Sequence, residues 1–295
     1  MELPEKIKHV SISSFGRASG ELTHPGHYQF DYINTEAPPV SLTMINTGQN
    51  YKNGAVHPIF LQNLPEGFIR KFISEKLSRY ADVNDMYLIA LQRDNGIGHL
   101  TFQSELPDSE SEPTSLNDIL DWKSEEDLFP QLLEKYYLSG ITSGMQPKVS
   151  MKLESKGVIH QQEIIVKSFD PEFESLPVNE FVCMSAAKHC GLETPDFWLS
   201  DDRKCFVISR FDRGGESKIG VEDFSVLMGK KSSADKYRSS YETVLKATAR
   251  YTLDKNQIKK MFEYIVFSCM IGNGDAHLKN FSLVYDWNPK VKSMP

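Results

Sequence analysis

Apolar and polar side chains alternate over much of residues 9 to 44, which is the pattern of β-strands with one buried face. The alternation is clear at Val10 and Ile12, from Tyr28 to Tyr32, and from Val40 to Met44. Gly and Pro residues stand between these stretches, as expected for turns. This part of the chain is therefore predicted to consist of short strands joined by turns.

A helical spacing starts at Pro65, after which apolar residues recur at intervals of three and four. It predicts a helix whose first turn contains Pro65 and Glu66. A second, shorter helix is predicted directly after it, with Asn84 as its N-cap. Strands followed by helices indicate a small α+β unit.

The predicted domain boundary lies in a segment that is rich in Ser, Asp, Glu and Pro and poor in apolar residues. Such a composition buries too little apolar surface to form a core. We therefore expect an amino-terminal α+β subdomain at residues 1–105, a linker at 106–130, and a second domain at 131–295.

The second domain is predicted to begin with a glycine-containing loop at 140–148 and two strands, at 149–153 and 163–169. Glycines ahead of a strand can bring backbone N–H groups against phosphate oxygens, although an ordinary tight turn has the same pattern. In the second strand, Lys167 shares a face with apolar neighbours. Burying a charged lysine among apolar side chains costs free energy unless an anionic group pairs with it.

A partner for Lys167 is offered by the next predicted helix, which runs from about Asn179 to Cys190 and is closed by Gly191. Glu180 lies in its first turn. Kinase-like enzymes pair a strand lysine with a glutamate of the following helix to hold the lysine against the α- and β-phosphates. In the alternative, Lys167 extends into water from a sheet edge and Glu180 only complements the helix dipole.

Two further segments complete the pattern. A strand from Lys204 runs into a charged turn, which either contacts an adenine through its backbone or ends in a surface salt bridge between Asp212 and Arg210 or Arg213. The residues from Gln257 to Ile271 carry a complete three-four apolar stripe and are predicted to be a core helix.

The polar loop Gly272 to Asn280 follows that helix. Its Asp275, Lys279 and Asn280 have the spacing of the catalytic loop of kinase-like phosphotransferases. There the Asp orients or accepts the proton of the attacking hydroxyl, and the Asn holds a magnesium ion. The alternative is a polar turn that caps the preceding helix.

Composition limits the classes of function. With 295 residues, 40% of them apolar, the chain can bury a sizeable core. Its net charge of −7 argues against a protein that binds nucleic acid through an overall positive charge. Charges are scattered through Met1 to Val10, and there is no apolar run of about 18 residues, so we expect neither a signal peptide nor a membrane span, and a cytoplasmic protein. The cysteines lack C-x-x-C spacing and are predicted to be buried, reduced thiols: Cys183, Cys190, Cys205 and Cys269.

Taken in chain order, these features resemble the HipA family of bacterial toxin serine/threonine kinases. They are the glycine loop, the strand lysine, the helix glutamate, the Arg-Phe-Asp-Arg turn at 210–213 and the Gly-Asn-x-Asp-x-His-x-Lys-Asn loop at 272–280. The segments 63–67 and 96–102 look like the family's amino-terminal subdomain, so the likeness covers almost the whole chain. It implies an α+β fold in which this subdomain precedes a kinase-like domain with an antiparallel-sheet small lobe and the start of a helical large lobe.

The resemblance implies ATP and magnesium as cofactors and assigns roles to residues. Asp275 is the implied catalytic aspartate, His277 and Lys279 support its loop, and Asn280 is a magnesium ligand. The implied ATP-binding residues are Gly144, Gln146, Lys148, Lys167, Glu180, and Ser209 to Phe211. The family autophosphorylates a serine of the glycine loop; Ile141 stands at that position here, and the hydroxyls nearby are Ser139, Thr142 and Ser143.

The implied function is transfer of the ATP γ-phosphate to a protein serine or threonine, with an aminoacyl-tRNA synthetase as a possible target and a DNA-binding HipB-type antitoxin as partner. The family's second magnesium aspartate is not matched: Asp286 comes too early, and the sequence ends at Pro295 before such a residue. The alternative is therefore a catalytically incomplete homologue that binds an antitoxin or another partner. A metal-dependent phosphohydrolase around Asp275 and His277 is disfavoured, because no further His or carboxylate cluster completes a metal site.

Overall fold

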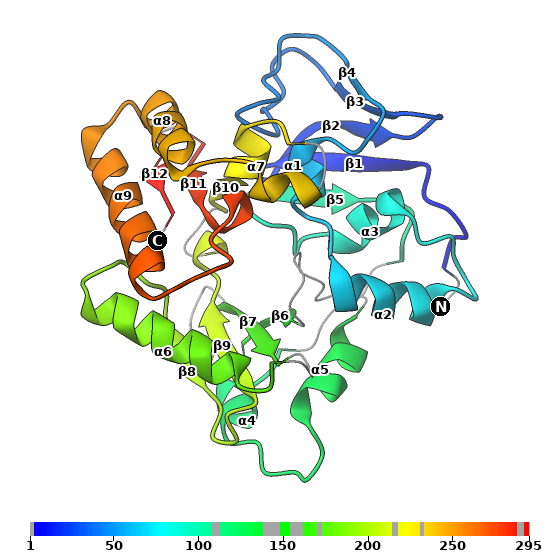
Figure 1. The fold of residues 1–295 in the computed structure, drawn as a ribbon. Coiled ribbons are helices and arrows are strands. Elements are labelled where there is room, and N and C mark those ends of the chain that lie inside the picture. Colours follow the sequence, from blue (N-terminus) through cyan, green and yellow to red (C-terminus); the bar gives the residue numbers. More distant parts are fainter. Residues whose placement is uncertain are drawn as a thin grey trace.

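The structure is a computed structural model that describes residues 3–107, 113–137, 148–153, 162–169, 173–213, 218–230, 233–287 and 292–294. It has the predicted α+β class, with three antiparallel sheets and helices packed around them (Figure 1). No helix in these ranges is both long enough and apolar enough to cross a membrane.

The amino-terminal sheet has five antiparallel strands in the order β4-β3-β2-β1-β5. They are β1 (His9–Ser14), β2 (Arg17–Thr23), β3 (Tyr28–Tyr32), β4 (Tyr51–Asn53) and β5 (Leu100–Gln103). Val10, Ile12 and Phe30 are fully buried, because alternate residues of a strand face the core. The predicted strands around Val10 and around Tyr28 to Tyr32 are confirmed.

The prediction of a third strand from Val40 to Met44 is wrong. Only a single bridge joins Ser41 to Met44. The Leu42 N–H donates instead to the carboxylate of Glu222, at 2.7 Å. The apolar alternation reflects burial of Val40 and Met44, whereas the backbone between them is held by a distant part of the chain.

The helices of the subdomain are α1 (Pro58–Leu61), α2 (Gly67–Leu77) and α3 (Asp85–Gln92). Both predicted helices are confirmed, and the Asn84 side chain caps α3 by accepting a hydrogen bond from the Tyr87 N–H at 3.1 Å. Glu66 is the N-cap of α2 rather than part of its first turn, and its side chain makes no capping hydrogen bond. That carboxylate is therefore available for contacts outside the helix.

The small lobe is a second antiparallel sheet in the order β6-β7-β9-β8, with α6 against it. Its elements are β6 (Lys148–Lys152), β7 (Glu163–Ser168), α6 (Leu176–His189), β8 (Phe197–Leu199) and β9 (Cys205–Ser209). Helix α6 begins three residues before the predicted start, since Pro177 fits a first turn where its missing N–H costs nothing. Glu180 therefore lies in the second turn, while Gly191 has the left-handed backbone (φ +80°) that was predicted.

Two helices join these sheets: α4 (Leu116–Leu120) and α5 (Leu128–Tyr136). Both fall at least partly within the predicted linker, 106–130, yet Ile119, Leu128 and Phe129 are buried. The main apolar core runs without a break from the amino-terminal sheet through these helices into the small lobe. The two predicted domains thus share one core in the described part of the chain, and the boundaries themselves stay a prediction.

The last part of the chain forms a three-stranded antiparallel sheet, β10-β11-β12, with helices beside it. Its elements are η1 (Phe211–Arg213), β10 (Gly220–Asp223), α7 (Phe224–Leu227), η2 (Ser233–Tyr237), α8 (Tyr241–Thr252), α9 (Lys255–Met270), η3 (Leu278–Asn280), β11 (Ser282–Tyr285) and β12 (Lys292–Ser293). A second, smaller core lies here.

The predicted core role of α9 is correct for one face only. Met261 and Ile265 are buried in the second core, whereas Phe262 and Met270 are 53% and 81% exposed. The cysteines also depart from the prediction, because Cys205 is buried but Cys190 and Cys269 are exposed. All the cysteines are free thiols.

Candidate functional site

The small-lobe sheet places two lysines side by side. Lys148 of β6 pairs in register with Lys167 of β7. The Lys167 Nζ lies 2.8 Å from the Glu180 Oε2 of α6, so the predicted ion pair is confirmed and Lys167 does not simply extend into water. Burial, together with the neighbouring Lys167 ammonium, lowers the pKa of Lys148 to about 8. Two adjacent ammonium groups repel each other and attract an anion such as a phosphate.

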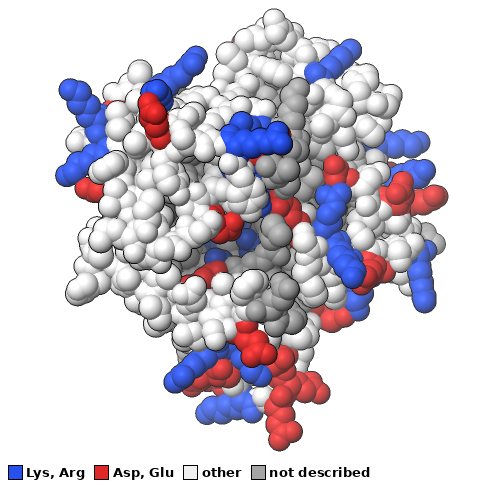
Figure 2. Space-filling model, viewed as in Figure 1, with Lys and Arg blue, Asp and Glu red and all other residues white. Residues whose placement is uncertain are grey.

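The same charged region extends to the loop after α9. Lys279 and Glu66 lie close enough to Lys148 to affect its pKa. Figure 2 shows lysine or arginine and aspartate or glutamate side chains together in a hollow near the centre of this face. Charged residues from the amino-terminal subdomain, the small lobe and the polar loop therefore converge.

The polar loop is positioned by α9, whose end is followed by Gly272 with a left-handed backbone (φ +71°). Within the loop, the Asp275 N–H donates to the Asn273 side chain at 3.1 Å, and the Asn280 amide donates to the Asp275 carbonyl. The Asp275 side chain remains 69% exposed. The loop backbone is thus fixed while its carboxylate can be reached from outside.

Two aromatic side chains flank the Asp275 carboxylate. The Tyr237 hydroxyl donates to its Oδ1 at 3.2 Å, and the His277 Nε2 lies 3.6 Å from the same oxygen. His277 Nδ1 accepts the Lys279 N–H at 3.2 Å, so a neutral His277 carries its proton on Nε2, toward Asp275. Burial lowers the pKa of His277, which favours that neutral form. Tyr237 was not anticipated from the sequence, in which no motif includes it.

Glu66 is a second unanticipated member of the site. Its Oε1 lies 2.5 Å from the Lys279 Nζ, and its Oε2 lies 3.8 Å from the Lys236 Nζ. The three side chains are only 18%, 16% and 8% exposed, respectively. An acidic residue at the start of a helix ordinarily interacts with the N–H groups and dipole of that helix. Nothing in the sequence around Glu66 therefore predicts its contact with Lys279, 213 positions later.

The Arg-Phe-Asp-Arg turn contains the expected ion pairs of Asp212 with Arg210 and Arg213, but they are buried and not at the surface. Arg210 donates to Asp212 at 3.0 and 2.7 Å and to the Gly96 carbonyl at 3.0 Å. Asp212 in turn accepts the Gly98 N–H at 2.9 Å, and Arg213 donates to the carbonyls of Gly96 and Gly98. Burial opposes ionisation of Asp212, but Arg210 outweighs it and lowers the pKa of Asp212 to about 2. The turn therefore fastens the small lobe to the segment 96–98.

The predicted adenine contacts at Ser209 and Phe211 stay a prediction. The Ser209 N–H already donates to the Asp196 carbonyl and the Arg210 N–H to the Glu163 carbonyl, both at 2.8 Å. A base at this position would need other groups of the connector. The glycine-loop residues lie in 138–147, outside the described residues, and their roles stay predictions too: Gly144, Gln146, Ser139, Thr142 and Ser143.

A magnesium ion would have few protein ligands here. The described residues contain no group of three His, Cys, Asp or Glu side chains that could hold a metal. The Asn280 nitrogen is used on the Asp275 carbonyl, which leaves the side-chain oxygen as the ligand atom. Magnesium is commonly bound by one or two protein groups plus substrate phosphates, so Asn280 fits such a site but does not complete it.

Comparison with known proteins gives the family. Residues 141–294, more than half of the chain, match the HipA-like C-terminal domain, and residues 10–103 match the HipA N-terminal domain. The chain belongs to the HipA family.

Relatives of this HipA-family chain include Y4dM of Sinorhizobium fredii, a predicted kinase that is 27% identical over 255 residues, covering 79% of this chain. A predicted kinase of Haemophilus influenzae is 29% identical over 171 residues, or 52% of this chain. The chain spans 59% and 50% of the lengths of these two relatives. The HipA fold is also shown by a solved structure of Shewanella oneidensis HipA with HipB and operator DNA, with a TM-score of 0.69, 18% identity, and coverage of 97% of this chain and 74% of that one.

Proposed function

We propose that this chain is the kinase of a HipA-type toxin–antitoxin pair and transfers the γ-phosphate of ATP to a serine or threonine of a protein. The observation that carries the proposal is the Lys167–Glu180 pair, which lies in the same charged region as the loop bearing Asp275 and Asn280. A lysine held by a helix glutamate and an aspartate five residues before an asparagine are the parts that phosphoryl transfer needs.

In this proposal Lys167 and Lys148 neutralise phosphate oxygens of ATP, and Glu180 keeps Lys167 in place. Asp275 takes the proton of the acceptor hydroxyl as its oxygen attacks the γ-phosphorus, and the bond from that phosphorus to the β–γ bridging oxygen breaks, releasing ADP. Magnesium bound at Asn280 would supply charge neutralisation on the phosphates. Tyr237 and His277 orient the Asp275 carboxylate through the contacts described above.

The likeness to a solved relative supports a proposal for the partner. The Shewanella oneidensis relative was solved with HipB and operator DNA. We propose a HipB-type antitoxin for this chain as well, and a cytoplasmic substrate such as an aminoacyl-tRNA synthetase.

The test is transfer of radiolabelled phosphate from ATP, together with calorimetric binding of a non-hydrolysable ATP analogue. Lys167→Met should lower transfer by at least about a hundredfold, the cost of losing one preorganised charge partner. The matched control is Lys52→Met, since Lys52 is an exposed lysine on strand β4 and should leave both measurements unchanged. Wild-type protein that binds no nucleotide, or a Lys167→Met variant with full transfer, would refute the proposal.

A further inference from the structure

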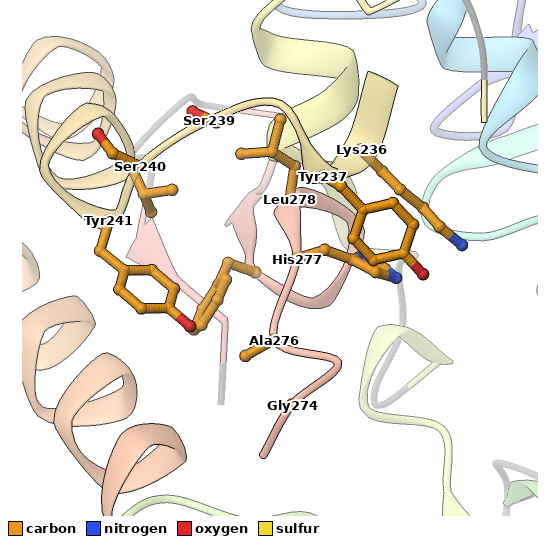
Figure 3. Close-up of a pocket in the computed structure, with 11 residues that line it drawn as sticks. Lys236, Tyr237, Ser239, Ser240, Tyr241, Gly274, Ala276, His277 and Leu278 are labelled. Atoms are coloured by element: carbon orange, nitrogen blue, oxygen red, sulfur yellow. The ribbon is translucent and has the colours of Figure 1, made fainter. Parts of the chain in front are cut away.

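A cavity of about 290 Å³ opens beside the polar loop, between that loop and the start of α8 (Figure 3). Its inner wall consists of Val244, Leu278 and Phe281, which are 1%, 3% and 6% exposed and belong to the second core. Tyr237 and Tyr241, at 59% and 37% exposed, stand at its rim. Ligand pockets start at roughly 300 Å³, so the space suits a single side chain better than a nucleotide.

The cavity adjoins the expected position of the acceptor hydroxyl. Gly274 and Ala276, on either side of Asp275, both line it. So does Tyr237, whose hydroxyl is 3.2 Å from the Asp275 carboxylate. Consecutive residues of an extended peptide are about 3.3–3.8 Å apart, so the neighbour of a serine placed at Asp275 would reach the cavity.

The chemistry of the walls selects an apolar group. The residues that line the cavity in the described part of the chain include no carboxylate, and the two that can carry a positive charge already face acids: the Lys236 ammonium lies 3.8 Å from Glu66, and the His277 Nε2 lies 3.6 Å from Asp275. A charged side chain would lose its hydration there without gaining a counter-ion, whereas an apolar one gains by leaving water. None of the lining residues comes from β6, β7 or β9, so the cavity is separate from the Lys148 and Lys167 ammonium groups.

We propose that this cavity binds an apolar side chain directly next to the acceptor serine or threonine of the protein substrate. The inference rests on the proposed phosphotransfer for its placement and adds a sequence preference to it. Substrate segments with Leu, Met or Phe beside the acceptor are preferred, and those with Asp or Glu there are rejected.

The decisive measurement is peptide binding, because it does not require turnover. Fluorescently labelled peptides with one serine in an alanine and glycine background carry Leu, Phe, Gly or Asp immediately before or after that serine. Anisotropy titration is done with the full chain, magnesium and a non-hydrolysable ATP analogue. For one of the two flanking positions, Leu or Phe peptides should bind at least tenfold more tightly than Asp peptides.

Two variants locate that preference in the cavity. Gly274→Leu adds a large apolar side chain to the lining, and an added Cβ at Gly274 meets no atom within 4 Å, so folding is not expected to change. Tyr241→Ala removes part of the rim. Either variant should reduce the Leu-to-Asp ratio to below about threefold, while the control Tyr80→Ala, at a tyrosine 63% exposed in the amino-terminal subdomain, should keep it.

The outcomes separate this inference from the proposed function. Equal affinity for all flanking residues, or a preference that survives Gly274→Leu, would overturn the cavity assignment whether or not phosphate is transferred. A preference that is lost in Gly274→Leu supports it. Absence of transfer to the bound peptides, measured in parallel with radiolabelled ATP, would count against the kinase and leave the peptide site standing.

Discussion

Replacing Glu66 by Gln tests whether the amino-terminal subdomain holds the polar loop in place. The substitution keeps the shape of the side chain but removes the negative charge between Lys279 and Lys236. A hydrogen bond to a charged group contributes about 1.5–3 kcal/mol, and breaking a buried ion pair costs about 3–5 kcal/mol. Glu66 and Lys279 are still 18% and 16% exposed, so water screens part of their attraction. We therefore expect Glu66→Gln to lower the free energy of unfolding by about 2 kcal/mol, within the range for a charged hydrogen bond.

For a chain of 295 residues that loss corresponds to a fall in thermal midpoint of roughly 3 °C, measured by circular dichroism. Glu75→Gln is the matched control, since Glu75 is on the same helix α2 but pairs with Lys71 at 3.8 Å with both side chains more than 60% exposed. A surface pair of that kind contributes about 0–1 kcal/mol, so the control should shift the midpoint little.

A double-mutant cycle with Lys279→Met isolates the contact. Glu66→Gln and Lys279→Met should show a coupling of about 1 kcal/mol or more, because each removes the partner of the other. Additivity of the two changes within about 0.5 kcal/mol would refute the reasoning, since distant, independent sites add to that precision.

The remaining predictions concern other buried or reactive charges. Asp275→Asn should abolish phosphate transfer while ATP-analogue binding and the thermal midpoint stay almost unchanged; retained activity would count against its catalytic role. Asp212→Asn should destabilise the fold by about 3–5 kcal/mol in urea unfolding, because Arg210 is left buried without its main partner; a loss below about 1 kcal/mol would contradict this. Burial raises the pKa of Glu222 from 4.5 to about 7, so the stability that its proton contributes is present below about pH 4.5 and is lost as the pH rises through about 7. The thermal midpoint should therefore fall less between about pH 5 and pH 7.5 in Glu222→Gln than in the wild type, with part of the fall remaining because the pKa of Asp223 is raised in the same direction. An equal fall in both proteins would exclude Glu222 as the titrating group.

Local patterns predicted those parts of the fold that depend on neighbours in sequence. The cap at Asn84 and the left-handed Gly191 follow from backbone chemistry within one helix end. The Lys167–Glu180 pair could be predicted because the strand and the following helix are adjacent elements. Helix α6 begins three residues before the predicted start at Asn179, because Pro177 is favoured in a first helical turn.

Three further errors involve contacts between distant segments. The alternation from Val40 to Met44 is real, but the backbone is held by Glu222, some 180 positions later. The burial of Arg210 depends on carbonyls of the segment 94–98, and the role of Glu66 depends on Lys279. Periodicity reports which face of an element is buried, and it carries no information about which remote group satisfies a charge.

The buried lock between the Arg-Phe-Asp-Arg turn and the segment 96–98 limits how this protein can be recombined. An added Cβ at Gly98 would lie 2.8 Å from the Val221 backbone nitrogen, and the Gly98 N–H donates a hydrogen bond to the Asp212 carboxylate. A side chain at Gly98 would therefore displace this backbone and with it the hydrogen bond to the turn. A chimera that takes its amino-terminal subdomain from one homologue and its small-lobe sheet from another should assemble only when the segment 96–98 and the Arg-Phe-Asp-Arg turn come from the same parent.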